Sequence, residues 1–410
     1  MGDPQRFDSL VILGNGYSAH LAALALSPLL PDVTLLGPET VQTTGPENLT
    51  GQYAHSHIFL PRMERELRSI EPQILDHLAA LGHTFVPGSY RLRADAPIEC
   101  RRMFATRWQF NAAMNQVFRQ RVPNIHIPDM LRGMRTDHSC ITRLILASGS
   151  EVKVTSSTLV VDAMGTRSPL MQALSKGSPN TINEAGGIAY ITQFFRLKYA
   201  AQVRSLPDPL IDCPHDFGNA YIMLYPAVNG WFSVSLAINV QQKLLMKQLR
   251  NTDDFLAFCK QNPNVAAWLN NADVIGGNRI YINPRNQWNV TVFTESQTPK
   301  NYVAVGDALT TMLPTLGANC SFAATHIRIL RDLVAAPTAD LHTAFAQAVH
   351  AEQFAFFQNA RIPQVHAGTF LPYAQARHNR PSKRIKSFLR RIFGLDRARI
   401  QRQLMDSSSL

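Results

Sequence analysis

Two glycines and an alanine lie between an apolar run and a helical pattern near the start of the chain. Residues 10–13 are apolar, Gly14-Asn-Gly16-Tyr-Ser-Ala19 follows, and residues 33–36 form a second apolar run. Gly14 would permit a tight turn, Gly16 would let the backbone approach a pyrophosphate, and Ala19 is small enough for helix–sheet packing. The free N–H groups of the helix would face the phosphates. The spacing predicts a dinucleotide-binding βαβ unit, with an ordinary tight strand-to-helix turn as the alternative.

The acid that usually ends the second strand of such a unit is missing. Gly37 and Pro38 occupy its place, and Glu39 comes two residues later. An acid at this place normally accepts hydrogen bonds from a ribose hydroxyl. Without this acid, either the nucleotide would be held more loosely or its pocket would be altered, and the sequence leaves both alternatives open.

Two later stretches also place an acid and a glycine where an apolar strand ends. One is Asp162-Ala-Met-Gly165-Thr-Arg-Ser168, and the other is Gly306-Asp307. Strands of α/β sheets carry ligand contacts at their carboxyl ends. Asp307 is therefore a candidate acceptor for the hydroxyl groups of a ligand.

A loop with a proline and a glycine follows Asp307. Pro314 and Gly317 precede a long helical pattern over about residues 318–335. The N-terminus of that helix would stabilise partial negative charge on a bound ligand.

His55 and His57 alternate, so they share one face of an extended segment. No third ligand is near them in the sequence, so we expect no metal site. A loop that lies against a cofactor is the functional interpretation, and a solvated loop is the alternative.

Three arginines precede or begin a helical pattern over about residues 104–121. They are Arg101, Arg102 and Arg107. A helix N-terminus prefers acids, so a bound phosphate or carboxylate would explain at least one of these cations. A solvated charged turn is the alternative. An earlier helical pattern covers about residues 62–81.

Residues 186–295 have the alternating pattern of an antiparallel sheet. Two alternating runs, 221–225 and 231–238, are separated by the hairpin signal Asn229-Gly230. One face of this sheet would line a pocket for an apolar substrate, with an ordinary sheet core as the alternative. The candidate pocket residues are Tyr190, Tyr221, Tyr225 and Trp231.

Composition indicates a packed globular chain. The 410 residues are 45% hydrophobic and 17% charged. No apolar run is long enough to span a membrane, and no secretory signal is recognisable. The five cysteines form no CxxC pair, which favours a reducing compartment. We therefore expect a cytoplasmic protein.

The formal charge of +11 belongs mainly to the C-terminal tail. Ten Lys or Arg and one acid lie between Arg377 and Arg402, a net of +9 that leaves +2 for the rest of the chain. We therefore expect no nucleic-acid partner. Residues 382–404 have the pattern of a basic amphipathic helix, which predicts a peripheral contact with an anionic membrane or an acidic partner. Packing of its apolar face on the protein body is the alternative.

The three glycine-containing stretches, in this order and separation, resemble the single-component FAD-dependent monooxygenases of the para-hydroxybenzoate hydroxylase type. The resemblance covers about residues 8–335. The segment from His55 to Arg62, Arg107 before its helix, and Gly187-Ile-Ala-Tyr190 are similar to the bacterial branch that includes polyether-forming epoxidases.

The resemblance implies a role for each matching residue. The pyrophosphate of FAD would lie on the first glycine turn, Arg107 near the phosphates or the flavin, and Asp307 on the ribityl chain. Asp162 and the residues after it would contact the cofactor and NAD(P)H. The implied cofactor-binding residues are Gly14, Gly16, Ala19, Arg107, Asp162, Asp307, Pro314, Gly317 and Ala318. The sequence departs from the family at Gly37 and at Gly317-Ala-Asn319, where Gly-x-Gly is usual.

The implied fold class is α/β, with a Rossmann-like FAD-binding domain, an inserted and mostly antiparallel sheet domain, and a C-terminal helical segment. The predicted divisions are residues 1–180 and 296–340 for the FAD-binding domain, 181–295 for the substrate sheet, and 341–410 for the C-terminal helices and tail.

The implied activity is hydroxylation or epoxidation of an apolar or aromatic small molecule with NAD(P)H and dioxygen. The flavin carries the chemistry, so no catalytic side chain is assigned. The substrate would be free or bound to a carrier protein. The alternatives on the same fold are a halogenase, a prenyl-chain reductase and a binding protein without redox activity. The halogenase element Trp-x-Trp-x-Ile-Pro has only a partial match at Trp231.

Overall fold

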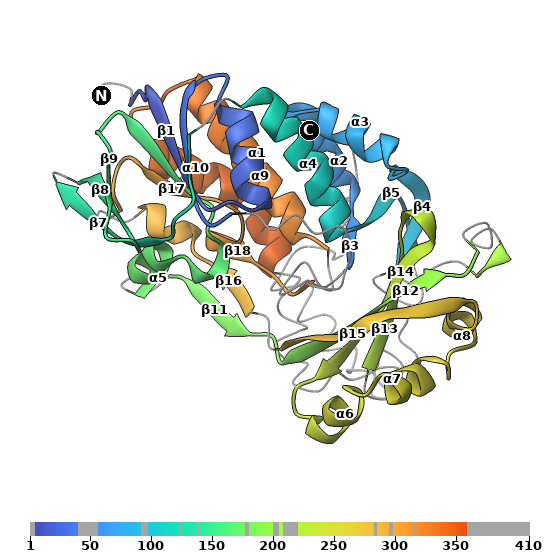
Figure 1. The fold of residues 1–410 in the computed structure, drawn as a ribbon. Helices are drawn as coiled ribbons and strands as arrows, with labels where there is room; N and C mark the ends of the chain where they lie inside the picture. The colour runs from blue at the N-terminus through green and yellow to red at the C-terminus, as the bar shows by residue number, and fades with distance from the viewer. Residues whose placement is uncertain are drawn as a thin grey trace, which may run out of the picture.

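The computed structural model places most of the chain in two lobes (Figure 1). The residues that it describes are 5–39, 56–91, 97–122, 125–137, 139–176, 180–199, 205–207, 220–282, 285–294, 298–314 and 317–358. The basic tail and His55 lie outside these residues, so the predictions made for them stay predictions.

The larger lobe is built on a five-stranded parallel sheet of order β17-β10-β1-β2-β6. All five residues of β10 are buried, as expected for a parallel strand covered on both faces. This is the predicted Rossmann-like sheet. Its strands are β1 (Ser9–Leu13), β2 (Asp32–Leu36), β6 (Ile125–Ile127), β10 (Thr158–Asp162) and β17 (Tyr302–Ala304).

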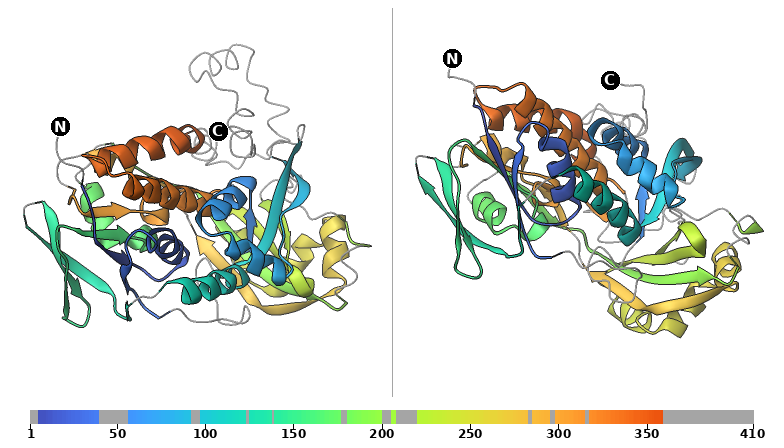
Figure 2. Two further views of the ribbon diagram at one scale, coloured as in Figure 1. Left: turned by 90° about the horizontal axis from the view of Figure 1, so that it is seen from above. Right: turned by 45° about the horizontal axis from the view of Figure 1, so that its top comes forward.

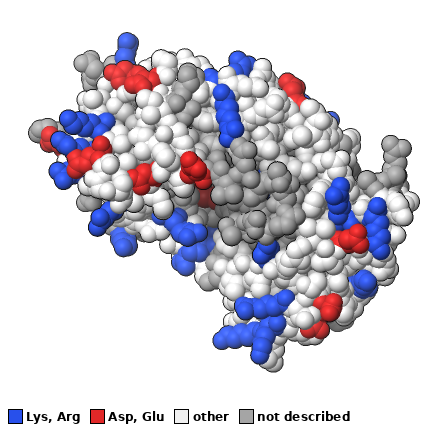
Figure 3. All heavy atoms as spheres, in the orientation of Figure 1, with Lys and Arg blue, Asp and Glu red and all other residues white. Residues whose placement is uncertain are grey.

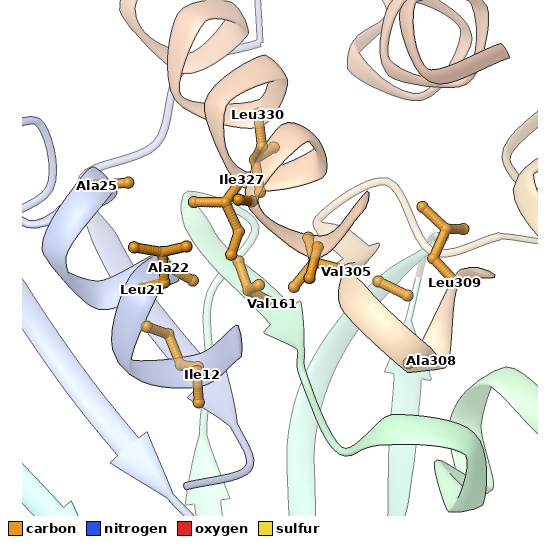
Figure 4. Packing of buried hydrophobic residues seen from close by; sticks show 14 of the residues in the cluster. Ile12, Leu21, Ala22, Ala25, Val161, Val305, Ala308, Leu309, Ile327 and Leu330 are labelled. Carbon is orange, nitrogen blue, oxygen red and sulfur yellow. The ribbon is translucent and has the colours of Figure 1, made fainter. Parts of the chain in front are cut away.

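Helices α1 (Tyr17–Leu26) and α9 (Asn319–Ala335) pack on each other and over this sheet. Figure 4 shows Ala22 of α1 and Ile327 of α9 above Val161 of β10. Nine of the ten residues of α1 are buried, so its alanines permit the close packing that a central helix needs. Next to them lie α2 (Pro61–Ile70), α3 (Gln73–Ala80), α4 (Arg107–Arg121) and α10 (Leu341–Val349).

Two of the predicted helices have different bounds. The pattern over 62–81 forms two helices because Pro72 forces the preceding Glu71 into an extended conformation (φ −156°). The pattern over 104–121 becomes helical only at Arg107, because residues 97–106 are paired in strand β5 (Pro97–Thr106). Arg101 and Arg102 are therefore strand residues, and Arg101 pairs with Glu64 at 3.1 Å.

The smaller lobe is an antiparallel sheet of order β13-β14-β12-β15. Strands β13 (Ala220–Pro226) and β14 (Trp231–Asn239) form the predicted hairpin, and Asn229 at its turn has a positive φ of 57°. The other strands are β12 (Ile188–Leu197) and β15 (Ala272–Ile282). Three short helices cover the outer face: α6 (Lys243–Gln248), α7 (Thr252–Cys259) and α8 (Pro263–Leu269).

Each lobe has its own apolar core, and the core of the sheet lobe is formed by residues between 189 and 269. A third apolar cluster lies between the lobes and contains Tyr190 and Tyr225 of the sheet together with Ile58, Leu60 and Leu313 of the larger lobe. Figure 2 shows the sheet lobe against the larger lobe in two further views. The predicted domain boundaries themselves stay predictions.

Small sheets and short helices complete the fold. One sheet has the order β3-β5-β4, one the order β11-β16-β18, and β7, β8 and β9 form an antiparallel meander. Their bounds are β3 (Ser56–Phe59), β4 (Val86–Arg91), β7 (Leu131–Asp137), β8 (Cys140–Leu146), β9 (Glu151–Lys153), β11 (Ile182–Ala185), β16 (Arg285–Trp288) and β18 (Thr310–Thr311). The remaining helix, α5, covers Pro169–Lys176, and a π-helix covers His350–Phe354.

On the face shown in Figure 3, side chains of both charges are interspersed over the larger lobe. Among the described residues, no helix is both long and apolar enough to cross a membrane.

Candidate functional site

The first glycine turn joins β1 to α1 and has one closed and one open side. Gly14 has φ +113°, and a Cβ there would lie 2.7 Å from the carbonyl oxygen of Ala163. Gly16 is the N-cap of α1, has no side-chain cap, and would meet no atom within 4 Å if it carried a Cβ. The first N–H groups of α1 therefore start beside an open space, which suits a phosphate group. Ala19 is fully buried in the helix.

The end of β2 is tied to this turn by side chains that we did not predict. The Asn15 Nδ2 atom donates to the Pro38 carbonyl (2.8 Å), and the His126 Nε2 atom lies 3.0 Å from the Gly37 carbonyl. Glu39 is exposed. No carboxylate stands at Gly37 itself, in agreement with the departure that the sequence showed.

The Gly306–Ala308 turn is held by three elements. His326 of α9 accepts a hydrogen bond from the Gly306 N–H (3.1 Å). Thr311 donates to the Asp307 carbonyl (3.0 Å), and the Asn289 side chain donates to the Ala308 carbonyl (3.1 Å). These bonds hold the backbone on both sides of the half-buried Asp307.

Gly306 also brings the Gly306–Ala308 turn close to the first glycine turn, at the start of α1. Its φ is +63°, and a Cβ there would collide with the Ser18 side chain of α1. The Asp307 carboxylate acts across the gap between the lobes as well. Burial raises the pKa of Tyr281 in β15, and the negative charge of Asp307 raises it further. The turn therefore lies against α1, and the Asp307 carboxylate is near enough to the inner face of the antiparallel sheet to influence Tyr281.

The N-terminal ends of three helices converge on Arg107. Tyr17 begins α1, Arg107 begins α4, and Cys320 is the second residue of α9. The buried guanidinium of Arg107 donates to Cys320 Sγ (3.1 Å) and lies 5.0 Å from the centre of the Tyr17 ring. The Tyr17 hydroxyl donates to the Cys320 carbonyl (3.0 Å). A buried cation and three positive helix ends in one place attract negative charge.

Burial keeps the Tyr17 hydroxyl and the Cys320 thiol of this cluster protonated. It raises the pKa of Tyr17 well above its usual value, and it raises the pKa of the Cys320 thiol although Arg107 acts in the opposite direction. Arg107 therefore carries the positive charge of the cluster without a thiolate beside it.

The loop before α9 is fixed by Gly317, which the family pattern shares, and by Asn319, which stands where that pattern has a second glycine. Gly317 has φ +60°, and a Cβ there would lie 2.8 Å from the Ile58 side chain. The Asn319 side chain accepts from the Met312 N–H (2.9 Å) and donates to the Met312 carbonyl (2.8 Å). Asn319 thus joins the start of α9 to Met312, the residue that follows β18. Pro314 is exposed and Ala318, the N-cap of α9, is buried.

Asp162, for which a cofactor contact was predicted, is bonded to groups of the chain itself. Its carboxylate is fully buried and accepts hydrogen bonds from the Met164 N–H (3.0 Å), the Tyr302 hydroxyl (2.7 Å) and the Ser168 hydroxyl. Burial raises its pKa. Three protein donors therefore occupy this carboxylate and hold the loop that carries Gly165, and the predicted cofactor contact of Asp162 stays a prediction.

The four candidate pocket residues lie on one face of the antiparallel sheet, the face toward the larger lobe. Tyr190 and Tyr225 are buried in the cluster between the lobes, whereas Tyr221 and Trp231 are half-buried. The Trp231 ring lies 5.8 Å from the ring of Trp108, at an interplanar angle of 80°. Tyr281 belongs to the same face but was not predicted, since Gly276-Gly277 interrupts the strand pattern.

Among the described residues, no group of three His, Cys, Asp or Glu side chains could hold a metal ion. The site therefore consists of helix ends, glycine turns, Arg107 and Asp307 on one side, and an aromatic sheet face on the other.

No protein-family sequence model and no curated protein sequence matches the chain. Solved structures do match. The structure of the flavin-dependent brominase Bmp2 has a TM-score of 0.62 at 15% identity, covering 95% of this chain and 93% of that one. A mutant of 2-methyl-3-hydroxypyridine-5-carboxylic acid oxygenase has a TM-score of 0.61 at 14% identity, covering 88% of this chain and 91% of that one.

A third similar structure is that of the Diels-Alderase PyrE3 from the biosynthetic pathway of pyrroindomycins. Its TM-score is 0.64 at 14% identity, and the match covers 98% of this chain and 82% of that one. The chain therefore has the α/β fold of the FAD-dependent monooxygenases and halogenases, as the sequence predicted. At such low identity the similarity defines the fold and not the reaction.

Proposed function

We propose that this protein is an FAD-dependent monooxygenase that uses NAD(P)H and dioxygen. The observation that carries the proposal is the convergence of the helix starts at Tyr17, Arg107 and Cys320 on one buried cation. The positive ends of the helices repel a guanidinium, so a negative charge bound beside Arg107 would be stabilising. An anionic cofactor accounts for the arrangement.

The residues present fit FAD at three of its parts. Gly14, Gly16 and the first N–H groups of α1 would hold the pyrophosphate, because the space beside Gly16 is open. Asp307 would accept hydrogen bonds from the ribityl hydroxyls. The N-terminus of α9 after Ala318 would face the flavin ring system, where its N–H groups and Arg107 would stabilise negative charge. Asp162 would support this site through its loop.

When bound, FAD would supply electron transfer from NAD(P)H to dioxygen and oxygen transfer to the substrate. The chain's own contribution would be to bind the substrate, to orient it and to exclude water. The apolar cluster between the lobes, which includes Leu60, Tyr190 and Leu313, closes the larger lobe against the sheet on one side.

We further propose an apolar or aromatic substrate with an electron-rich carbon. Tyr221, Trp231 and Tyr281 present ring surface from the sheet toward the larger lobe. Aromatic faces of this kind bind apolar and planar ligands well. The resemblance to the epoxidase branch makes an alkene as suitable as an arene, and a substrate attached to a carrier protein is included in the proposal.

The alternative is a flavin-dependent halogenase, which the similarity to the brominase structure favours. The sequence at Trp231 argues against it, because Gly230-Trp-Phe-Ser-Val-Ser lacks the second Trp and the Ile-Pro of the halogenase element. Dependence of the product on bromide or chloride separates the two activities.

The test is flavin binding followed by turnover. The purified protein, or the protein after addition of FAD, should keep flavin absorbance bands through desalting, and aromatic or alkene compounds should accelerate NAD(P)H oxidation in the presence of dioxygen. Asp307→Ala should lower the flavin occupancy, while Asp253→Ala on the exposed start of α7 should not. A protein that retains no flavin absorbance after addition of FAD and desalting would refute the proposal.

A further inference from the structure

His326 connects the Asp307 turn to the C-terminal part of the chain. It lies in α9, is fully buried, and neither the sequence patterns nor the resemblance singled it out. Its Nδ1 atom lies 3.1 Å from the backbone nitrogen of Gly306, and its Nε2 atom lies 2.8 Å from the Gln353 Oε1 atom.

The hydrogen-bond directions of this chain of groups are determined by chemistry. The Gly306 N–H can only donate, so Nδ1 must accept and carries no proton. Nε2 therefore carries the proton and donates to the Gln353 carbonyl oxygen. The Gln353 amide nitrogen in turn donates to the Phe322 carbonyl (3.2 Å). Every member of this buried chain is satisfied in only one tautomer of His326.

Gln353 is held in place by its neighbours in the π-helix His350–Phe354. Glu352 pairs with Arg328 of α9 at 2.6 Å and also with Arg62 of α2. Phe354 packs on Trp288 with ring centres 5.0 Å apart. π-helices are rare and locally costly, so a segment of this kind needs a compensating contact. The bond from Gln353 to His326 is such a contact.

We propose that Gln353, through His326, is a positioning residue for the Gly306–Asp307 turn, so that the C-terminal π-helix sets the geometry of the flavin-binding site. This rests on the proposed function where it concerns flavin. The part that concerns the turn itself is independent of any cofactor, because the hydrogen bonds lie within the chain.

Hydrogen exchange of the cofactor-free protein tests the positioning. His326→Leu removes the acceptor for the Gly306 N–H, and Gln353→Leu removes the acceptor that fixes the tautomer. We expect amide exchange at Gly306 to accelerate at least tenfold in both variants. His326→Asn keeps an acceptor near the Nδ1 position but lacks the Nε2–H group that bonds Gln353, so exchange at Gly306 should accelerate in it as in Gln353→Leu.

His83→Leu is the matched control. His83 is also buried and has one backbone partner, the Phe104 carbonyl at 3.1 Å, on the strand β5. It should leave Gly306 protected. Equal exchange at Gly306 in wild type and His326→Leu, or equal acceleration by His83→Leu, would overturn the proposal. If His326→Leu does not fold, the exchange rates at Gly306 in Gln353→Leu and His326→Asn test the proposal instead, and wild-type rates in both would overturn it.

FAD titration of the same variants tests the consequence for the site. The dissociation constant should rise about tenfold in Gln353→Leu and in His326→Asn, because both variants lose the bond between residues 353 and 326. Unchanged FAD affinity with faster exchange at Gly306 would overturn the link to the cofactor site. A wild-type protein that binds no FAD would refute the proposed function, and the exchange experiment alone would then decide whether Gln353 positions the turn.

Discussion

Gly37 lies against the backbone of Gly14. A Cβ built on Gly37 would come within 2.8 Å of the Gly14 carbonyl carbon and 3.0 Å of the Asn15 nitrogen. Such distances are too short for a real side chain, so the end of β2 and the glycine turn can approach this closely only because position 37 has no Cβ. The missing ribose acid therefore has a steric explanation, and the nearest acid in the sequence, Glu39, is exposed.

This contact predicts that restoring the acid will not improve nucleotide binding. Gly37→Asp and Gly37→Ala should each lower the free energy of unfolding by about 1–3 kcal/mol, because the new Cβ forces the two backbones apart. Gly133→Ala is the control, since a Cβ there would meet no atom within 4 Å. Urea unfolding measures the stabilities and FAD titration the affinity. Tighter FAD binding by Gly37→Asp would contradict this explanation.

Gly16 allows stability and cofactor binding to be separated. Serine is a better N-cap than glycine by a few tenths of a kcal/mol, and the extended backbone of Gly16 (φ −103°) accommodates it. Gly16→Ser should therefore leave the cofactor-free protein as stable as the wild type or slightly more stable. The side chain would occupy the space assigned to the pyrophosphate, so the FAD dissociation constant should rise at least tenfold.

Unfolding of the cofactor-free protein and fluorescence titration with FAD measure the two effects. Gly133→Ser, on the meander, should not change FAD affinity. Wild-type affinity in Gly16→Ser would show that the pyrophosphate does not lie at this turn.

Two buried histidines predict a loss of stability in mild acid. Burial lowers the pKa of His20 and of His326 to about 4, compared with 6.5 in an unfolded chain. Between these values the unfolded chain binds protons that the folded protein does not, so the free energy of unfolding falls as the pH falls through 6.5 toward 4. Between pH 7 and pH 5 each histidine should contribute a loss on the order of 2 kcal/mol.

Urea unfolding at the two pH values measures this loss. His326→Asn removes one titrating group and should reduce the loss between pH 7 and pH 5 by the share of that one histidine, on the order of 2 kcal/mol, even if it lowers the stability at pH 7. The same pH dependence in the wild type and the variant would show that His326 is not buried in its neutral form.

The sequence predicted the parts of the fold that depend on local pattern. The βαβ unit at Gly14, the hairpin at Asn229 and the strand that leads to Asp307 all follow from apolar periodicity and from glycine or asparagine at positions of positive φ. The split at Pro72 follows from a local rule as well, but the apolar spacing on both sides of it concealed the break.

The parts that could not be predicted depend on contacts between distant segments. Cys320 and Tyr17 are 303 residues apart, and His326 meets Gly306 and Gln353 only in the folded chain. Asp162 was predicted as a ligand contact because a strand-end acid gives the same signal whether it faces a ligand or internal donors. The three groups of the chain that donate to its carboxylate can be recognised only in the folded structure.

Neighbouring residues of β13 point to opposite faces of the sheet and give the sharpest test of the substrate site. Tyr221 is half-buried on the face toward the larger lobe, whereas Ile222 is fully buried under the covering helices. Ile222→Ala should lower the free energy of unfolding by about 2–5 kcal/mol and leave the substrate KM of the folded enzyme unchanged. Tyr221→Ala should cost less stability and raise the KM of the compound that best stimulates NAD(P)H oxidation.

Steady-state NAD(P)H oxidation and urea unfolding of both variants provide the comparison. Truncation of an aromatic contact with a bound ligand typically costs about 1–3 kcal/mol, so the KM of Tyr221→Ala should rise roughly 5- to 150-fold. The reverse pattern, with KM affected by Ile222→Ala and not by Tyr221→Ala, would place the substrate away from this face. Because the two residues are adjacent in one strand, a general loosening of β13 would affect both variants and would not produce this separation.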